Sequence, residues 1–144
     1  MIRLVILFAC LMSVASPDAS ANAADPRTVF ARHDPQGRLP NTKIRKLGVV
    51  RVKAATYDIY YLDFSNPVSL HGLQQIAIIR NGNQFAGAYT CTLGGGPDEG
   101  KLAIGKDRLT VRIHEMTFVI RFDAKGPTRN KYFCGEGSGW ENSI

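Results

Sequence analysis

Apolar and polar residues alternate along most of this chain from Leu47 onward. A period of two is the pattern of β-strands, whose side chains point to opposite faces in turn. Tight connections between such segments favour antiparallel neighbours. The pattern predicts an all-β domain of about seven or eight antiparallel strands, folded as a small barrel or a sandwich. The expected strands are 47–55, 57–64, 73–80, 84–93, 101–104, 108–113, 117–122 and 131–134.

Asn81-Gly82 lies between two of these segments and is a strong signal for a two-residue hairpin turn. A turn centred there keeps one face of the hairpin apolar, whereas a shift by one residue would place Arg80 opposite Phe85. The register that we predict pairs Ile78 with Phe85 and Ile76 with Gly87.

Segments 101–104, 108–113 and 117–122 predict a three-stranded meander with one continuous apolar face. Turns at Lys106-Asp107 and Glu115-Met116 would produce this face, although the second pair is poor turn chemistry. The opposite face carries Thr110, Arg112 and Arg121 and should be exposed to water. The expected pairs are Ile104 with Leu109, Leu102 with Val111, Ile113 with Phe118, Val111 with Ile120, and Leu109 with Phe122.

Aromatic residues gather on segment 57–64, which holds Tyr57, Tyr60, Tyr61 and Phe64. Alternation places large side chains on both faces, so we expect a strand that is buried on both sides. The functional alternative is that one face lines a pocket or presents tyrosine rings to a sugar or a partner.

The chain is divided into three parts by its composition. Residues 1–23 have the order of a secretory signal peptide: Arg3, the apolar run 4–15, and a small-x-small cleavage site at Ala21-Asn22-Ala23. The apolar run is too short to cross a bilayer, which takes about 20 residues. We therefore expect a periplasmic or secreted protein that is not transmembrane and is cleaved near Ala23/Ala24. An alternative is a lipoprotein with Cys10 lipidated.

Residues 24–46 form a polar N-terminal arm that is interrupted by three prolines. Asp25 and Pro26 are a favourable helix start, with Asp25 as the N-cap. We expect this arm to pack loosely on the β domain, 47–144, or to serve as a linker. The β domain ends in a glycine-rich tail that contains Trp140.

Two cysteines, Cys91 and Cys134, remain after the signal peptide. Cysteines in an oxidising compartment usually pair, and their spacing does not fit a redox or zinc motif. We predict one structural disulfide, and the hairpin register directs Cys91 inward on the face of Phe85 and Tyr89. The chain-entropy model makes such a bridge worth about 4 kcal/mol.

The formal net charge is +6 at pH 7, and it is unchanged by removal of Arg3 and Asp18 with the signal peptide. This charge is accounted for by solubility alone, or it attracts an anionic envelope component or an acidic protein, which a basic exported protein often meets. The basic residues are scattered, so nucleic acid is not an expected partner.

No catalytic, metal or cofactor motif is convincing. Residues 95–101 have the spacing of a phosphate loop, but Leu102 replaces the Ser/Thr that binds Mg²⁺. His33, His71 and His114 lack a metal-ligand spacing. No serine lies in a Gly-x-Ser-x-Gly elbow. We therefore predict no catalytic residue, no metal and no cofactor.

These observations favour a non-catalytic binding module of a bacterial-type envelope. Tyr57, Tyr60, Tyr61, Trp140, Arg112 and Arg121 are the candidate binding residues. Trp140 would act as a binding anchor or as a plug over one barrel end. One alternative is an inhibitor of an envelope-active enzyme, since periplasmic lysozyme inhibitors are similar in architecture, although their motifs are not found here. Another is a small hydrolase or lyase that uses the barrel mouth.

Overall fold

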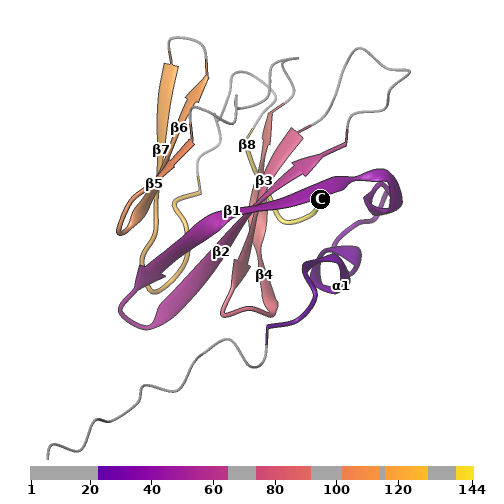
Figure 1. Ribbon diagram of the computed structural model, residues 1–144, viewed down its shortest axis with the longest axis horizontal. Helices are drawn as coiled ribbons and strands as arrows, with labels where there is room; N and C mark the ends of the chain where they lie inside the picture. The colour runs from indigo at the N-terminus through magenta and orange to yellow at the C-terminus, as the bar shows by residue number, and fades with distance from the viewer. Residues whose placement is uncertain (1–22, 65–73, 92–101, 114–115, 130–138) are drawn as a thin grey trace, which may run out of the picture.

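A computed structural model describes residues 23–64, 74–91, 102–113, 116–129 and 139–144, with only the backbone of Cys91, Ile113 and Met116. This part of the chain is mostly β, with eight strands, one short α-helix and one 3-10 turn (Figure 1). No helix among these residues is long and apolar enough to cross a membrane.

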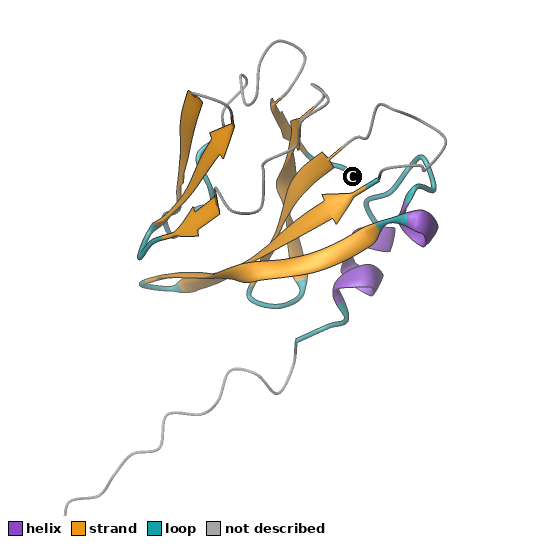
Figure 2. Ribbon diagram, turned by 45° about the horizontal axis from the view of Figure 1, so that its top comes forward, coloured by secondary structure: helices purple, strands orange, loops and turns teal. Residues whose placement is uncertain are grey.

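The strands form two antiparallel sheets. The larger sheet has five strands in the order β1-β2-β3-β4-β8, and the smaller has three in the order β5-β6-β7. No ladder joins the two sheets within the described ranges, so these strands do not close into a barrel (Figure 2). The bounds are β1 Lys43–Val52, β2 Ala55–Asp63, β3 Gln74–Arg80, β4 Gln84–Cys91, β5 Leu102–Ile104, β6 Arg108–Ile113, β7 Met116–Arg121 and β8 Gly139–Glu141.

The main hydrophobic core is shared by the two sheets. The five-stranded sheet contributes Val50, Ala55, Tyr57, Ile59, Ile76, Ile78 and Tyr89, and the smaller sheet and its following loop contribute Leu109, Val111, Ile120 and Phe122. Burial of this apolar area is the main force that holds the sheets together.

A second core lies on the other face of the five-stranded sheet. It is covered by α1 (Pro26–Ala31) and the 3-10 turn η1 (Leu39–Asn41), whose Val29, Phe30 and Leu39 are buried. The expectation of a loosely packed arm is therefore wrong. The predicted helix start is confirmed, because the Asp25 carboxylate accepts a hydrogen bond from the Arg27 N–H at 3.1 Å. The sheet residues of this core are Tyr60, Leu62, Ala77, Ile79 and Ala88, joined by Ile144.

Strand β2 is buried on both faces, as its sequence predicts. Tyr57 and Ile59 lie in the core between the sheets, whereas Tyr60 and Leu62 lie under α1. This strand therefore connects the two cores.

The β3–β4 hairpin turns where we predicted but has a different register. Asn81 and Gly82 both have positive φ, at 50° and 74°, as the expected primed turn requires. However, Arg80 pairs with Gln84, Ile79 with Phe85, and Ile78 with Gly87. Asn83 and a bulge at Ala86 add two residues to β4, which moves Phe85 to the α1 face. The prediction failed because it assumed one apolar face, while α1 lets both faces accept apolar residues.

The three-stranded meander is confirmed between β5 and β6, which pair Ile104 with Leu109 and Leu102 with Val111. The β6–β7 pairing is offset by two residues from our expectation: Val111 faces Phe118 and Leu109 faces Ile120. An offset of two leaves each side chain on its predicted face. Thr110, Arg112 and Arg121 accordingly lie on the outer face.

The end of the chain forms a strand that we did not predict. β8 pairs with β4 through Glu141 with Ala88, Trp140 with Tyr89, and Gly139 with Thr90. The predicted strand 131–134 and the region of the predicted signal peptide before Ala23 lie outside the described residues.

Candidate functional site

A pocket of about 480 Å³ opens where the edge of β4 is only partly covered. Strand β8 pairs with Ala88–Thr90 and stops there, so the first half of β4 extends beyond it. The loop 122–129 faces this uncovered half. We call this cavity the Trp140 pocket. Its described lining residues are Tyr57, Arg80, Gln84, Phe85, Ala86, Asp123, Lys125, Gly126, Pro127, Thr128, Arg129, Trp140 and Asn142.

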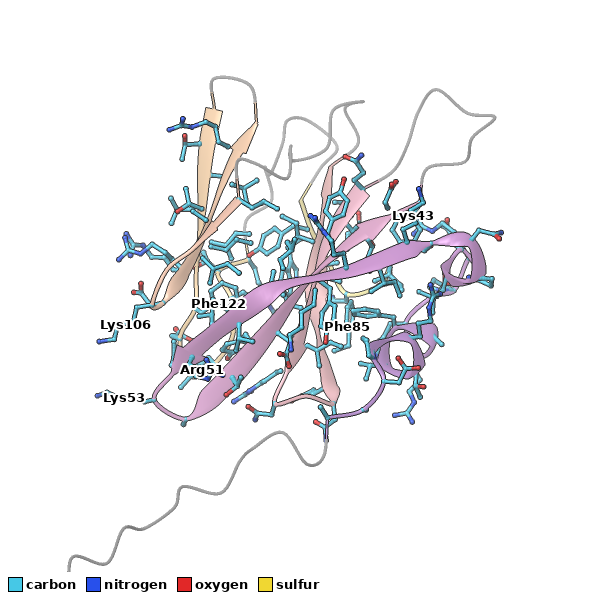
Figure 3. All side chains as sticks on the ribbon, in the orientation of Figure 1. Lys43, Arg51, Lys53, Phe85, Lys106 and Phe122 are labelled. Carbon is cyan, nitrogen blue, oxygen red and sulfur yellow. The ribbon has the colours of Figure 1, made fainter. Side chains whose placement is uncertain are left out.

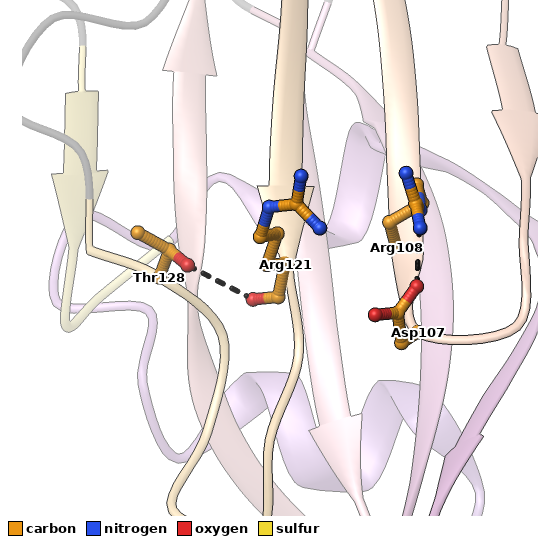
Figure 4. Close-up of polar contacts among 4 residues, drawn as sticks. All are labelled: Asp107, Arg108, Arg121 and Thr128. Carbon is orange, nitrogen blue, oxygen red and sulfur yellow. Dashed lines mark hydrogen bonds and ion pairs between the residues drawn. The ribbon is translucent and has the colours of Figure 1, made fainter.

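The loop that forms one wall is held by hydrogen bonds within the loop and to the end of β7. The Asp123 Oδ1 atom accepts hydrogen bonds from the N–H groups of Lys125 at 2.7 Å and Gly126 at 3.1 Å. Such an Asx arrangement is a common way to turn a chain. Thr128 returns to β7, where its N–H donates to the Arg121 carbonyl at 2.8 Å. Its hydroxyl donates to the same carbonyl at 3.1 Å (Figure 4).

Three side chains of the five-stranded sheet fix the same loop. The Tyr57 hydroxyl donates to the Asp123 carbonyl at 2.8 Å, and an Arg80 Nη donates to the Ala124 carbonyl at 2.8 Å. The Tyr89 hydroxyl donates to the Thr128 carbonyl. The pocket wall is therefore preorganised by bonds that do not use the side chains of the loop.

Trp140 forms the aromatic wall of the pocket and contacts Tyr89 edge to face, with ring centroids 5.0 Å apart. Gly87 makes this position possible, because a methyl group there would overlap the indole ring. The φ of Gly87 is 128°, which side-chain-bearing residues rarely adopt. The position of the Trp140 ring therefore depends on the glycine beside the bulge of β4.

Positive charge dominates the pocket. Arg80, Lys125 and Arg129 line it, against the single carboxylate of Asp123 among the described lining residues. None of the three cations forms an ion pair with a carboxylate in the described part of the chain. The Arg129 guanidinium lies over the Trp140 ring, 5.8 Å from its centroid.

Two buried donors in the lining have no hydrogen-bond partner within the described ranges. They are Nε of Arg80 and Nε1 of Trp140. Buried donors are nearly always paired in folded proteins, because an unpaired one costs about 1–3 kcal/mol. Both atoms are enclosed by protein, so they do not by themselves indicate a ligand.

The two tyrosines beside the pocket remain protonated at neutral pH. Burial raises the pKa of the phenols of Tyr57 and Tyr89, and nearby Arg80 and Arg129 only partly oppose this effect. Both hydroxyls therefore act as hydrogen-bond donors to the loop and not as bases.

A second cavity, of about 470 Å³, lies beside α1 and has a different character. Its cation, Arg27, donates to the Leu39 carbonyl at 3.1 Å and to the Thr42 carbonyl at 2.9 Å. These bonds tie the helix to the start of β1. Arg27 is the single cation among the described lining residues of this cavity and is held by these bonds. The Trp140 pocket has Lys125 and Arg129 in addition to Arg80, so it is the better candidate site.

The structure brings together only some of the predicted site residues. Tyr57 and Trp140 both line the Trp140 pocket. Tyr60 and Tyr61 are buried elsewhere on β2, and Arg112 and Arg121 are exposed on the smaller sheet. Cys91 ends β4, and its proposed partner Cys134 lies outside the described residues.

The pocket cations Arg80, Lys125 and Arg129 were missed at the level of sequence. The available signal was Asp123-Ala124-Lys125-Gly126-Pro127, which combines turn-forming residues with a cation directly after an apolar strand. Arg80 gave no separate signal, because an arginine at the end of a strand is common.

No group of three His, Cys, Asp or Glu residues that could hold a metal occurs among the described residues. Comparisons with protein-family models, with curated proteins and with solved structures found no match for this chain.

Proposed function

We propose that the protein is an exported, non-catalytic binding module that holds an anionic ligand in the Trp140 pocket. The observation that carries this proposal is the charge balance of the lining, where Arg80, Lys125 and Arg129 face a single carboxylate. A concave site with convergent donors and an aromatic wall is typical of small-molecule recognition. Its excess positive charge favours a carboxylate or a phosphate.

The residues that line the Trp140 pocket support ligand binding rather than catalysis. Acid–base chemistry needs a group that can exchange a proton with the substrate near neutral pH. The Asp123 Oδ1 atom already accepts two backbone hydrogen bonds within the loop. The tyrosines donate to carbonyl groups of the loop. The described groups are therefore suited to orient and neutralise an anion.

Export and a disulfide are parts of this proposal. The leader pattern of residues 1–23 supports secretion, and Cys91 and Cys134 would pair in an oxidising compartment. The shared core of the two open sheets supports a sandwich as the completed fold. Thiol titration of protein isolated from its own envelope should find no free thiol, and two free thiols would contradict the disulfide.

The ligand proposal can be tested through Trp140, the single tryptophan of the chain. Titration with glucuronic acid and glucose 6-phosphate should change the indole emission, whereas neutral glucose should not. The double variant Lys125→Gln/Arg129→Gln should bind the charged sugars at least about tenfold more weakly, because each charge-assisted hydrogen bond contributes about 1.5–3 kcal/mol.

The matched control removes the same charge at two residues that do not line the pocket, as Arg51→Gln/Lys53→Gln in β1 and its turn. This variant should bind like the unmodified protein. An equal response to glucose, or equal weakening by both double variants, would overturn the proposal. A response to only one of the two charged sugars would distinguish a carboxylate site from a phosphate site.

A further inference from the structure

The outer face of the three-stranded sheet carries an unusual set of side chains. Alternation directs Leu109, Val111 and Ile120 inward, where all three are buried. The side chains at the alternate positions of β6 and β7 point away from the core. We call this surface the arginine face, and its residues are Arg108, Thr110, Arg112, Thr117, Val119 and Arg121.

Two arginines of this face are direct cross-strand neighbours. Arg108 on β6 pairs in register with Arg121 on β7, and both are exposed (Figure 4). Like charges directly opposite each other destabilise a sheet. Asp107 interacts with both arginines and reduces this repulsion, and a bound anion would reduce it further.

Little negative charge compensates the arginine face. Asp107 forms an ion pair with Arg108 at 3.0 Å, and both side chains are nearly half exposed. Arg112 and Arg121 form no ion pair with a carboxylate among the described residues. Typical protein surfaces intersperse both signs of charge. The face therefore has a net positive charge, which Asp107 offsets only in part.

Further lysines extend the positive charge beyond the sheet. Lys106 lies in the β5–β6 turn beside Arg108, and Lys53 lies in the β1–β2 turn. Both turns project from the same end of the molecule (Figure 3). Long-range attraction to an anionic surface would thus not depend on the arginines alone.

An exposed apolar side chain lies among these charges. Among the described residues, Val119 is the large hydrophobic residue that is exposed, with 45% of its surface accessible. It pairs across the sheet with Thr110 and is followed two residues later by Arg121. Basic side chains around an apolar one are the combination that binds the surface of an anionic bilayer.

We propose that the arginine face docks on an anionic phospholipid surface, with its guanidinium groups on headgroup phosphates and Val119 at the level of the headgroups. Arginine binds phosphate through two parallel hydrogen bonds, which a lysine cannot do. This proposal does not rest on the Trp140 pocket, since no arginine-face residue lines that pocket.

Vesicle sedimentation tests this proposal with the purified protein. Vesicles of phosphatidylglycerol and phosphatidylcholine should sediment the protein, and vesicles of phosphatidylcholine alone should not. Each arginine that is removed should weaken binding about fivefold, so Arg112→Gln/Arg121→Gln should bind on the order of 25-fold more weakly. The loss should shrink in high salt, because screening weakens the interaction that is lost.

The control is Arg32→Gln/Lys43→Gln, which has the same net charge but removes exposed cations near α1. It should keep most of the binding, and circular dichroism should show both variants folded. Equal losses in the two variants would show a general charge effect and overturn the docking face. Binding of soluble dextran sulfate without binding of vesicles would also overturn it, because the occupant would then be a polyanion and not a bilayer.

Discussion

The two sheets are built from similar residues but are covered differently. The five-stranded sheet has a core on each face, one shared with the smaller sheet and one under α1. The three-stranded sheet is buried only on its inner face, and its outer face carries arginines and threonines. The number of buried faces therefore determines whether the strands of a sheet alternate between apolar and polar residues in the sequence. It also determines which sheet has a face exposed to solvent.

This difference is clearest in β2 and β3, whose sequences do not alternate between apolar and polar residues. Six successive residues of β2, Tyr57 to Leu62, are buried, so every position of this stretch must fit a neighbour. Even a polar residue, Gln75 of β3, is buried, and it donates to the Thr90 hydroxyl at 2.9 Å. On β6 and β7, by contrast, polar residues and Val119 occupy the outer positions, which are at least partly exposed.

Removing the cover of the larger sheet should have the largest effect. Phe30 is fully buried and contacts Tyr60 and Phe85 edge to face, at centroid distances of 5.5 and 6.1 Å. Phe30→Ala should lower the free energy of unfolding by about 3–5 kcal/mol, measured by denaturant titration. The control Val119→Ala on the uncovered face should change it by less than about 0.5 kcal/mol. Equal effects would contradict the proposed role of the cover.

A substitution at the bulge of β4 tests how the pocket depends on the larger sheet. Gly87→Ala should destabilise the protein by about 2 kcal/mol, because of its positive φ and the overlap with the Trp140 ring. It should also shift the emission of Trp140. Gly37→Ala is the control, since Gly37 has a φ of 65° but open space around its Cα. This control should cost less and leave the emission unchanged, and an unchanged emission in both variants would be evidence against the contact.

Alkaline pH should act on the five-stranded sheet, which holds Tyr57, Tyr60 and Tyr89. Burial raises the pKa of each of these phenols above that in the unfolded chain. Above about pH 10 the unfolded state loses protons that the folded state keeps, so stability should fall as pH rises. The slope is at most about 1.4 kcal/mol per pH unit for each tyrosine. Denaturation of Tyr89→Phe between pH 9 and about pH 11.5 should show a smaller slope, and an unchanged slope would refute this explanation.

The sequence predicted the smaller sheet better than the larger one for a physical reason. Where one face meets water, alternation identifies the face, and an error of two residues in the β6–β7 register moved no side chain across the sheet. Where both faces are buried, the pattern carries no such information. The bulge at Ala86 could therefore not be inferred, and neither could the burial of Phe85 beneath α1.

The candidate site was predicted only in part because it joins distant segments. Tyr57 and Trp140 are candidates from the sequence because they are large aromatic residues. Their cationic neighbours come from the end of β3 and from the loop after β7. Side chains become neighbours there through the pairing of β4 with β8, which follows from tertiary packing and not from a local pattern.

The three bonds by which Tyr57, Arg80 and Tyr89 hold the loop all end on main-chain carbonyls. Any amino acid supplies such an acceptor, so a substitution at Ala124 would leave these three bonds intact. The side chain at position 124 can therefore change while the loop keeps its path, because the anchoring on the five-stranded sheet depends on main-chain atoms.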